Sequence, residues 1–560
     1  MKMNNIYRIA VLMLGATMLA TSCIQEPIPL NGITTQDRIE MDPESEIEHK
    51  SNSMHTILIK NTVTGEDFDF GLPSLYATFD RAIGEVLPSN AYSGGNPYYD
   101  RFQYYAYQMG IGPGGACILV WHNYYKFIET TNEVLRLIGD DEKYTELRGR
   151  AKAFRAHHYL DLARYCDALY AESEYSDYIP ALEKVDGLTV PIVTEETTET
   201  SARNNPRAER EVMFQFIFDD LNEAEECLKD ATVTSKNLPS LSVIYGLKAR
   251  AYLWLGCFKQ GVYDTAKYPD VVTGNDAYKE AAKYARLAIE TSGCTPLTES
   301  QYCDPITGFN KINNSWMWGM IQSSKTIISN LHSWVSHMSC MAGWAYGSGT
   351  QPGVRKATYD RMSNTDFRKK IIVGPDTSYA NYKKVTNFTE KEWTTFGMEG
   401  AGIRTYANMK FRSGNGEKIN SSVGSVVDIP MMRVEEMYFI EAEATAHYNE
   451  NGAKQLITDF MTKYRDPKYS VAYTADLIDE IIFQKRVELW GEGVLFFDFK
   501  RLNMGIDNAY SGSNAPAGLK FETYGRCPAW NICIPLAEEQ QNEGIKGFNN
   551  PDPSQSITSR

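Results

Sequence analysis

Aromatic side chains gather in a segment that has neither the period of a helix nor that of a strand. Between positions 90 and 115, glycines and asparagines alternate with tyrosines, and amide, acid and guanidinium groups lie among them. This combination suits sugar binding, because aromatic rings cover the apolar C–H face of a pyranose while planar polar groups bond its hydroxyl rim. The candidate ligand contacts are Tyr98, Tyr99, Tyr104, Tyr105, Asn96, Asp100 and Arg101.

A second region of this kind lies between positions 291 and 428. Scattered Gly, Asn, Ser and Thr interrupt the helical spacing there, and short extended pieces are expected at 315–321 and 406–411. Its most turn-rich stretch is WAYGSGTQPG, from 344 to 353. Aromatic residues in long loops also pack the loop onto the protein body, so each candidate has a packing alternative. The candidates here are Trp334, Trp344, Tyr346 and Gln351.

The chain lacks the motifs of enzymes that can be recognised from sequence. No Gly-rich phosphate loop, GxSxG, HExxH or paired zinc-binding cysteines occur. His157 and His158 would point about 100° apart on a helix, which suits a helix surface better than a metal site. We therefore expect no cofactor, no metal and no catalysis. Glycoside hydrolysis stays open as an alternative, because it needs only two carboxylates and the chain has 71 acidic residues.

The composition indicates a large folded protein that does not bind nucleic acid. The chain has 560 residues, of which 43% are hydrophobic, and it can bury a sizeable core. Its net charge of −15 opposes binding to phosphate backbones, which requires clustered Lys and Arg. After the first twenty or so residues, nothing approaches the ~20 consecutive apolar residues that span a bilayer. Membrane attachment would have to come from the start of the chain.

The start of the chain resembles a bacterial lipoprotein signal. Two basic residues precede an apolar stretch at 9–19 that is too short to span a bilayer, and small residues lead to Cys23. Residues 1–22 are therefore predicted to be a signal peptide. Acyl chains on Cys23 would anchor the mature protein to a membrane without spanning it. The alternative is an ordinary secretory signal, since Ala20 stands where leucine is usual.

The nine other cysteines form no CxxC pair and no metal-finger spacing. Cys166, Cys227 and Cys257 lie in apolar helical patterns, which favours buried, inert thiols. A disulfide between Cys294 and Cys303, or one between Cys527 and Cys533, remains an alternative.

Most of the chain shows helical periodicity. After a tether and coil at 23–60, apolar residues recur three or four apart in four probable helix pairs, at 74–138, 142–228, 240–290 and 431–491. Small residues at helical steps would let neighbouring helices approach closely, as in tetratricopeptide-like hairpins, which bury their apolar faces only when stacked. Three tryptophans on helix stripes are predicted to be core residues, namely Trp121, Trp254 and Trp490.

The stretch from Asp476 to Arg501 joins a helix to an aromatic plug. Its apolar residues form a stripe, and Lys485 and Glu488 are expected to face outward. Gly491 and Gly493 would end the helix, because glycine enters left-handed backbone conformations without a Cβ penalty. The phenylalanines that follow are expected to anchor this segment against the body: Phe496, Phe497 and Phe499.

This stretch resembles the carboxy-terminal signature of the SusD/RagB-like outer-membrane nutrient-binding lipoproteins. The family pattern I-x-x-ER-x-EL-x-x-EG-x-R-x-x-D-L-x-R is met at Ile482, Arg486, Glu488, Leu489, Glu492, Gly493, Asp498 and Arg501. Lys485 and Leu495 depart from it, so one family ion pair is expected to be missing or rearranged. The segment DIPMMRVEEMYFIEAEA resembles a second family helix through Asp428, Pro430, Arg433, Glu436, Ala442, Glu443 and Ala444.

The resemblance implies a mostly α fold. It would be a single SusD-like domain at 61–560, built on a tetratricopeptide-like helical-hairpin scaffold (74–290 and 431–491). Long loop-rich insertions at 90–115 and 291–428 and a few short strands would complete it.

The resemblance also implies a function. The protein would be lipid-anchored, exposed at the surface of the outer membrane, and would deliver a captured oligosaccharide to a SusC-type TonB-dependent transporter, with the repeat face docking the barrel. A peptide-uptake lid of the RagB type and a helical-repeat adaptor for another protein remain alternatives.

Overall fold

The computed structural model of the chain describes residues 43–60, 62–88, 116–170, 172–176, 178–327, 331–397, 400–472, 474–520 and 522–552. The chain divides into two compact units, 1–50 and 51–560. The predicted tether and coil is wrong from Pro43 onward, because α3 (Pro43–Lys60) begins there. Its signals are local: proline at the first helical position, acids in the first turn and a lysine in the last. The predicted signal peptide and residues 23–42 lie outside the described residues.

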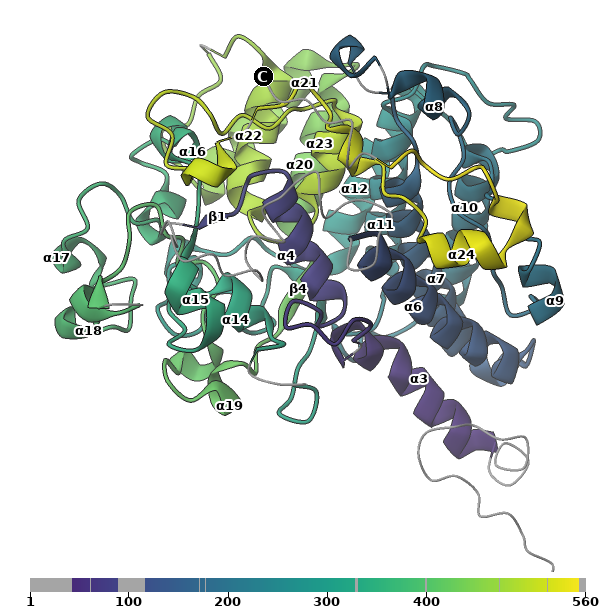
Figure 1. The fold of residues 1–560 in the computed structure, drawn as a ribbon, viewed down its shortest axis with the longest axis horizontal. Coiled ribbons are helices and arrows are strands. Elements are labelled where there is room, and N and C mark those ends of the chain that lie inside the picture. The colour runs from purple at the N-terminus through teal and green to yellow at the C-terminus, as the bar shows by residue number, and fades with distance from the viewer. Residues whose placement is uncertain are drawn as a thin grey trace, which may run out of the picture. The chain divides into compact units, whose positions relative to one another are not determined.

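Long helices that pack in chain order form the scaffold of the second unit (Figure 1). Helix α6 packs against α7, α7 against α10, α10 against α11, α11 against α12, and α12 against α20. The predicted pairings at 142–228 and 240–290 are confirmed, and so is the mostly α fold. The long helices are α4 (Leu72–Ala82), α6 (Ala116–Ile138), α7 (Thr145–Cys166), α10 (Arg210–Leu228), α11 (Leu241–Leu255), α12 (Asn275–Ser292), α20 (Val434–Ala446), α21 (Glu450–Tyr464) and α22 (Leu477–Leu489).

Shorter elements complete the unit. None of the helices in the described ranges is long and apolar enough to cross a membrane. The short helices are α8 (Ile179–Glu183), α9 (Glu199–Ala202), α13 (Glu299–Tyr302), α14 (Trp334–Met338), α15 (Ala345–Thr350), α16 (Lys356–Arg361), α17 (Tyr379–Tyr382), α18 (Glu390–Thr395), α19 (Ser421–Gly424), α23 (Leu495–Arg501) and α24 (Leu536–Gln541). The 3-10 turns are η1 (Glu142–Tyr144), η2 (Ser173–Tyr175), η3 (Phe367–Ile371), η5 (Gly414–Gly416), η6 (Ala517–Leu519), η7 (Pro528–Trp530) and η8 (Glu543–Ile545).

The described strands are few and short. Strand β1 (Leu87–Pro88) pairs antiparallel with β3 (Pro352–Gly353), and β2 (Trp316–Met320) pairs antiparallel with β4 (Ile429–Arg433). The extended piece predicted at 315–321 is thus confirmed as β2. The piece at 406–411 forms no regular strand; isolated bridges at Ala407 and Asn408 and backbone hydrogen bonds at Tyr406 and Met409 join it to other segments.

Glycines at helix contacts allow the close packing that the sequence predicts. A Cβ on Gly246 of α11 would lie 2.3 Å from the sulfur of Met432, and a Cβ on Gly149 of α7 would lie 2.6 Å from the Cβ of Cys227. Neither distance is compatible with a larger side chain. The core tryptophans are also confirmed, because Trp121, Trp254 and Trp490 are 5%, 1% and 2% exposed.

The Asp476–Arg501 stretch differs from its prediction in which residues are buried. Lys485 and Glu488 do not face outward, since their side chains are 3% and 0% exposed. Gly491 and Gly493 do end α22, with φ angles of 79° and 75°. The aromatic residues after them form α23, and its buried phenylalanines confirm the predicted anchoring: the ring of Phe496 lies 4.6 Å from Phe79 and 5.3 Å from Tyr165.

Glu488 lies at the centre of a buried ionic network. Its carboxylate accepts from Arg465 Nε at 2.7 Å, from Arg433 Nη1 at 3.1 Å and from Arg368 Nη1 at 3.1 Å. Although burial alone would raise the pKa of Glu488, these guanidinium groups hold it well below its usual range. The ion pair expected to be missing or rearranged is rearranged, because Lys485 lies 2.7 Å from Asp498.

The buried histidines correct one further expectation, and the free cysteines decide the disulfide alternatives that the sequence left open. His157 and His158 on α7 are both 0% exposed, so they do not lie on a helix surface. Burial lowers the pKa of both, to about 4 for His157. All nine cysteines in the described part of the chain are free, so neither alternative disulfide forms.

Replacing the central carboxylate is expected to destabilise the fold. The substitution Glu488→Gln leaves three buried guanidinium groups with one fewer negative charge. Removing one partner of a buried ion pair lowers the free energy of unfolding by about 3–5 kcal/mol. Chemical denaturation measures the loss. Lys279→Gln is the control, because the exposed Lys279–Asp276 pair on α12 contributes about 0–1 kcal/mol. Equal losses in the two variants would contradict a central role for the network.

The buried histidines predict a loss of stability in acid. Between pH 6.5 and about 4 the unfolded chain binds protons at these positions and the folded chain does not, so the free energy of unfolding falls as pH drops. Each histidine contributes about 1.4 kcal/mol per pH unit in that window. Urea titrations at pH 5, 6 and 7 should show a shallower dependence for the double variant His157→Gln and His158→Gln. His122→Gln is the control, since that side chain is 41% exposed, and an equal change in slope there would refute the assignment.

Candidate functional site

The structure describes only part of the predicted ligand-binding set. Tyr98, Tyr99, Tyr104, Tyr105, Asn96, Asp100 and Arg101 lie outside the described residues, as does Cys23. Of the second group, Trp334, Trp344 and Gln351 are 1%, 8% and 1% exposed, and Tyr346 is half-buried. The predictions for the first group therefore remain predictions.

The buried members of the second group have packing partners. The ring of Trp334 meets Phe411 edge-on, with centroids 4.9 Å apart. Trp344 packs so closely on Gly424 that a Cβ there would lie 2.2 Å from the indole. Gln351 donates to the carbonyl of Gly402 at 3.0 Å, and its Oε1 accepts from the backbone N–H of Arg404 at 2.8 Å. These side chains hold the insertion together in this structure, which leaves Tyr346 as the candidate with open surface.

Tyr346 is part of an aromatic column made from three separate segments. Its ring stacks on His337 of α14 with centroids 4.9 Å apart, and His337 stacks on Phe70 with centroids 5.1 Å apart. The Tyr346 hydroxyl donates to Asp67 Oδ2 at 2.7 Å. We call Phe70, His337 and Tyr346 the Tyr346 column; sequence periodicity gave no sign of it, because Phe70 and His337 are far apart in the chain.

His337 makes this column uncharged. It is 2% exposed, and burial, reinforced by the positive charge of Arg81, lowers its pKa to about 3. Its Nε2 lies 3.0 Å from the carbonyl oxygen of Asp67 and 3.2 Å from that of Leu331. Because both partners are acceptors, Nε2 carries the proton. The backbone carbonyl of His337 in turn accepts a hydrogen bond from Arg81 at 2.7 Å, so α4 holds the backbone that carries the ring.

The column can present a rigid ring to a ligand. Tyr346 is held by its hydroxyl bond to Asp67 and is supported on His337, so its exposed part needs no reordering before it stacks on a sugar. Stacking of this kind covers the apolar face of a pyranose and leaves the hydroxyl groups to polar neighbours. This chemistry suits binding and includes no proton transfer.

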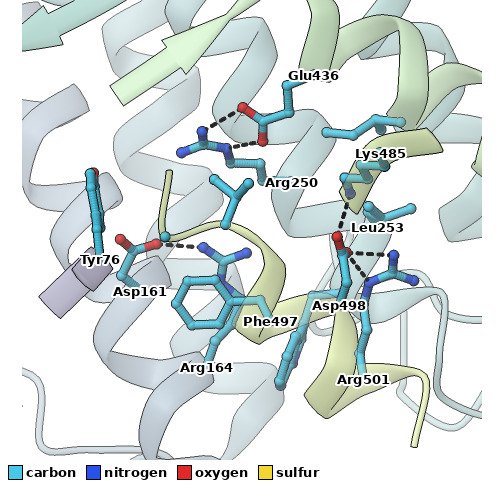
Figure 2. Close-up of a pocket in the computed structure, with 14 residues that line it drawn as sticks. Tyr76, Asp161, Arg164, Arg250, Leu253, Glu436, Lys485, Phe497, Asp498 and Arg501 are labelled. Atoms are coloured by element: carbon cyan, nitrogen blue, oxygen red, sulfur yellow. Dashed lines mark hydrogen bonds and ion pairs between the residues drawn. The ribbon is translucent and has the colours of Figure 1, made fainter. Parts of the chain in front are cut away.

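A second cluster of acidic and basic side chains surrounds a cavity that is too small for a large ligand. Figure 2 shows Arg250 paired with Glu436, Asp161 with Arg164, and Asp498 between Lys485 and Arg501, around a cavity of about 20 Å³. That volume admits one water molecule and no sugar. The Arg250–Glu436 pair joins α11 to α20 and the Lys485–Asp498 pair joins α22 to α23, whereas the Asp161–Arg164 pair lies within α7. Several of these positions belong to the family signature, so the resemblance identified them without showing that they share a cavity.

Three open hollows on the described surface are large enough for a ligand. One of about 1290 Å³ lies between α13, η3 and α17, one of about 730 Å³ lies beside α6, and one of about 660 Å³ lies near η2. Sequence reasoning missed all three, because each is lined by segments distant in the chain. Among the described residues, no group of three or more His, Cys, Asp and Glu side chains could hold a metal ion.

The packing role of Trp334 and the exposure of Tyr346 predict different outcomes for their alanine variants. Trp334→Ala removes a buried indole and should lower the free energy of unfolding by about 3–5 kcal/mol. Tyr346→Ala removes a half-buried ring and should cost clearly less, because less apolar area leaves the interior. Thermal and chemical denaturation of both variants provide the comparison. A larger loss for Tyr346→Ala would refute the assigned roles.

Two family models match the chain. The model described as the SusD family matches residues 298–552, and the model described as "Starch-binding associating with outer membrane" matches residues 100–253. No curated protein matches the sequence.

Solved structures share the fold over most of the chain. A SusD-like carbohydrate binding protein from Bacteroides vulgatus has a TM-score of 0.67 and 22% identity, covering 90% of this chain and 98% of its own. A SusD superfamily protein from Bacteroides thetaiotaomicron has a TM-score of 0.63 and 16% identity, with coverages of 90% and 99%. Surface glycan-binding protein A from the same species, in complex with laminarihexaose, has a TM-score of 0.57 and 13% identity, with coverages of 92% and 99%.

Proposed function

The chain belongs to the SusD/RagB-like family, and we propose that it is a non-catalytic carbohydrate-binding protein of the outer-membrane surface. It captures an oligosaccharide and passes it to a SusC-type TonB-dependent transporter. A lipid on Cys23 anchors it after removal of residues 1–22. The Tyr346 column carries the proposal, because it offers a preorganised aromatic surface in the insertion where sugar contacts are predicted.

The family supports the carbohydrate class of the ligand. One matching model describes starch binding, and one protein with the same fold was solved with laminarihexaose. The tyrosines, asparagine, aspartate and arginine of the 90–115 insertion belong to the same proposed site. They would add stacking surfaces and hydroxyl partners to the ring of Tyr346.

Weak binding suits a protein that hands its ligand on. Aromatic stacking contributes on the order of 1 kcal/mol per contact, so a few contacts give micromolar or weaker affinity and rapid release. The anchor holds the binding protein close to the transporter and raises its effective concentration there.

The structure also favours binding over hydrolysis. The carboxylate of Asp67, beside Tyr346, accepts a hydrogen bond from the tyrosine hydroxyl, whereas hydrolysis needs a pair of carboxylates flanking the scissile bond. The buried acids shown in Figure 2 line a cavity that no sugar can enter.

Loss of the Tyr346 ring is expected to weaken glycan binding. Calorimetric titration with laminarihexaose and maltohexaose, after a glycan array, should give a Kd in the micromolar range or weaker for the wild type. Tyr346→Ala should raise the Kd about tenfold, which corresponds to about 1.4 kcal/mol of lost stacking and positioning. Tyr448→Ala is the control, because Tyr448 is 40% exposed and lies just after α20.

Three other results would change the proposed function. Binding of a peptide mixture without any glycan binding would support a peptide-uptake lid. Shortened oligosaccharides after incubation would reveal a hydrolase. Capture of another protein without either ligand class, unaffected by changes in the insertions, would support an adaptor.

A further inference from the structure

We propose that a groove beside α6, separate from the Tyr346 column, is a second saccharide-binding site. We call it the α6 groove. Helix α6 lines one side, residues 191–205 with α9 line another, and α24 closes the third. These elements lie together at the lower right of Figure 1. The groove has a volume of about 730 Å³, which is large enough for several hexose units.

Two aromatic side chains one turn apart on α6 line the groove. The rings of Trp121 and Tyr125 lie 4.5 Å apart at an angle of 48°. Trp121 is 5% exposed, and its indole N–H is not one of the buried polar atoms without a partner in the described part of the chain. Because this side chain lines the groove, a ligand hydroxyl there can accept a hydrogen bond from the indole N–H. Sequence periodicity assigned Trp121 to the core and gave no sign of this open edge.

A hydrogen bond holds the Tyr125 ring in a position where a ligand in the groove can contact it. Its hydroxyl donates to the carbonyl of Pro191 at 2.7 Å, and the side chain remains half-buried. Together with Trp121 it gives the groove an aromatic side, which is the feature that sugar recognition requires.

The rim of the groove suits a neutral ligand rich in hydroxyl groups. The groove is lined by three basic side chains, Lys126, Arg136 and Arg203, and by four glutamates. Because these charges nearly balance, the groove favours neither an anionic nor a cationic ligand. Gln541 at the end of α24 is exposed and supplies both an amide donor and an acceptor. Such mixed donors and acceptors match sugar hydroxyls, which act in both ways.

Side-chain bonds to the backbone hold the walls of the groove in place. Asn132 donates to the carbonyl of Val193 at 3.0 Å, and Asn205 donates to that of Ile192 at 2.7 Å. Asn542 and Asn205 bond reciprocally, at 2.9 and 2.7 Å, and so tie the residue after α24 to the 191–205 segment. The groove is therefore formed before a ligand arrives, which lowers the entropic cost of binding.

The largest hollow lacks this aromatic surface. Of its two tyrosines, Tyr359 is covered by the ammonium group of Lys369, 4.5 Å from the ring centroid, and Tyr382 stacks on Trp393 at 5.1 Å. The hollow near η2 has two tyrosines, Tyr510 and Tyr524, but it also has four acids and no basic side chain, so its charge favours a cation over a neutral sugar. The α6 groove is thus the hollow whose chemistry points to a saccharide.

Titrations of the mature full-length chain with laminarihexaose and maltohexaose test the proposal. Three variants are compared with the wild type: Tyr346→Ala, the rim variant Arg136→Ala with Gln541→Ala, and the combination of all three substitutions. The binding that remains in Tyr346→Ala should weaken at least fivefold when the rim substitutions are added. Lys279→Ala on α12 is the matched surface control and should change nothing.

Trp121→Phe tests the indole N–H without removing the ring. It should weaken the same residual binding about threefold or more. Because the indole is largely buried, the variant also loses some stability, so its binding is measured well below its own melting temperature. The proposal is overturned if the rim substitutions and Trp121→Phe leave the residual binding unchanged, or if Tyr346→Ala abolishes all saccharide binding. Loss of binding in the rim variant with no effect of Tyr346→Ala would instead support the α6 groove and refute the Tyr346 column as the capture site.

Discussion

The buried charge of Glu488 is the constraint on which the arrangement of this protein depends. Arg465 follows α21, Arg433 ends β4 and Arg368 lies in η3, and all three donate to this carboxylate. A charge removed from water is tolerated only when close partners replace its hydration, so none of these elements can move away without exposing an unpaired charge in the interior. The main effect of the network is therefore to restrict these elements to one arrangement, because any other would leave a buried charge unpaired.

The same requirement connects the long insertion to the helical scaffold. Arg368 belongs to the 291–428 insertion, as does Lys410, whose ammonium group donates to the carbonyls of Glu488 and Trp490, both at 2.8 Å. Burial lowers the pKa of Lys410 to about 8, and nearby Glu492 opposes that shift. Although the insertion has little regular structure, the side chains of Arg368 and Lys410 bond it to the end of α22. Tyr346 therefore belongs to an insertion that is bonded to the helical scaffold through other residues, Arg368 and Lys410.

Sequence reasoning succeeded where local pattern decides the outcome and failed where partners decide it. Apolar spacing located the long helices, and Gly491 and Gly493 marked the end of α22. Lys485, Glu488 and the His157–His158 pair were placed at the surface because polar side chains usually lie there, yet each is buried among partners from other segments. Trp334 and Tyr346 had the same sequence context and different burial, which only the packing of α14 against Phe411 distinguishes. Family signatures identified the charged residues but gave no information about which of them meet.

The two proposed binding surfaces differ in what holds them, and this difference bears on how they act. The Tyr346 column joins α14 and α15 to the segment before α4, so its geometry depends on contacts between an insertion and the scaffold. The α6 groove is formed by a long helix and by segments bonded to it and to one another through side-chain amides and a tyrosine hydroxyl. Rearrangement of the insertion could alter the first surface without reaching the second. A saccharide long enough to meet both would then remain attached at the groove while the column released it, because each site contributes its own free energy of binding and neither shares a residue with the other.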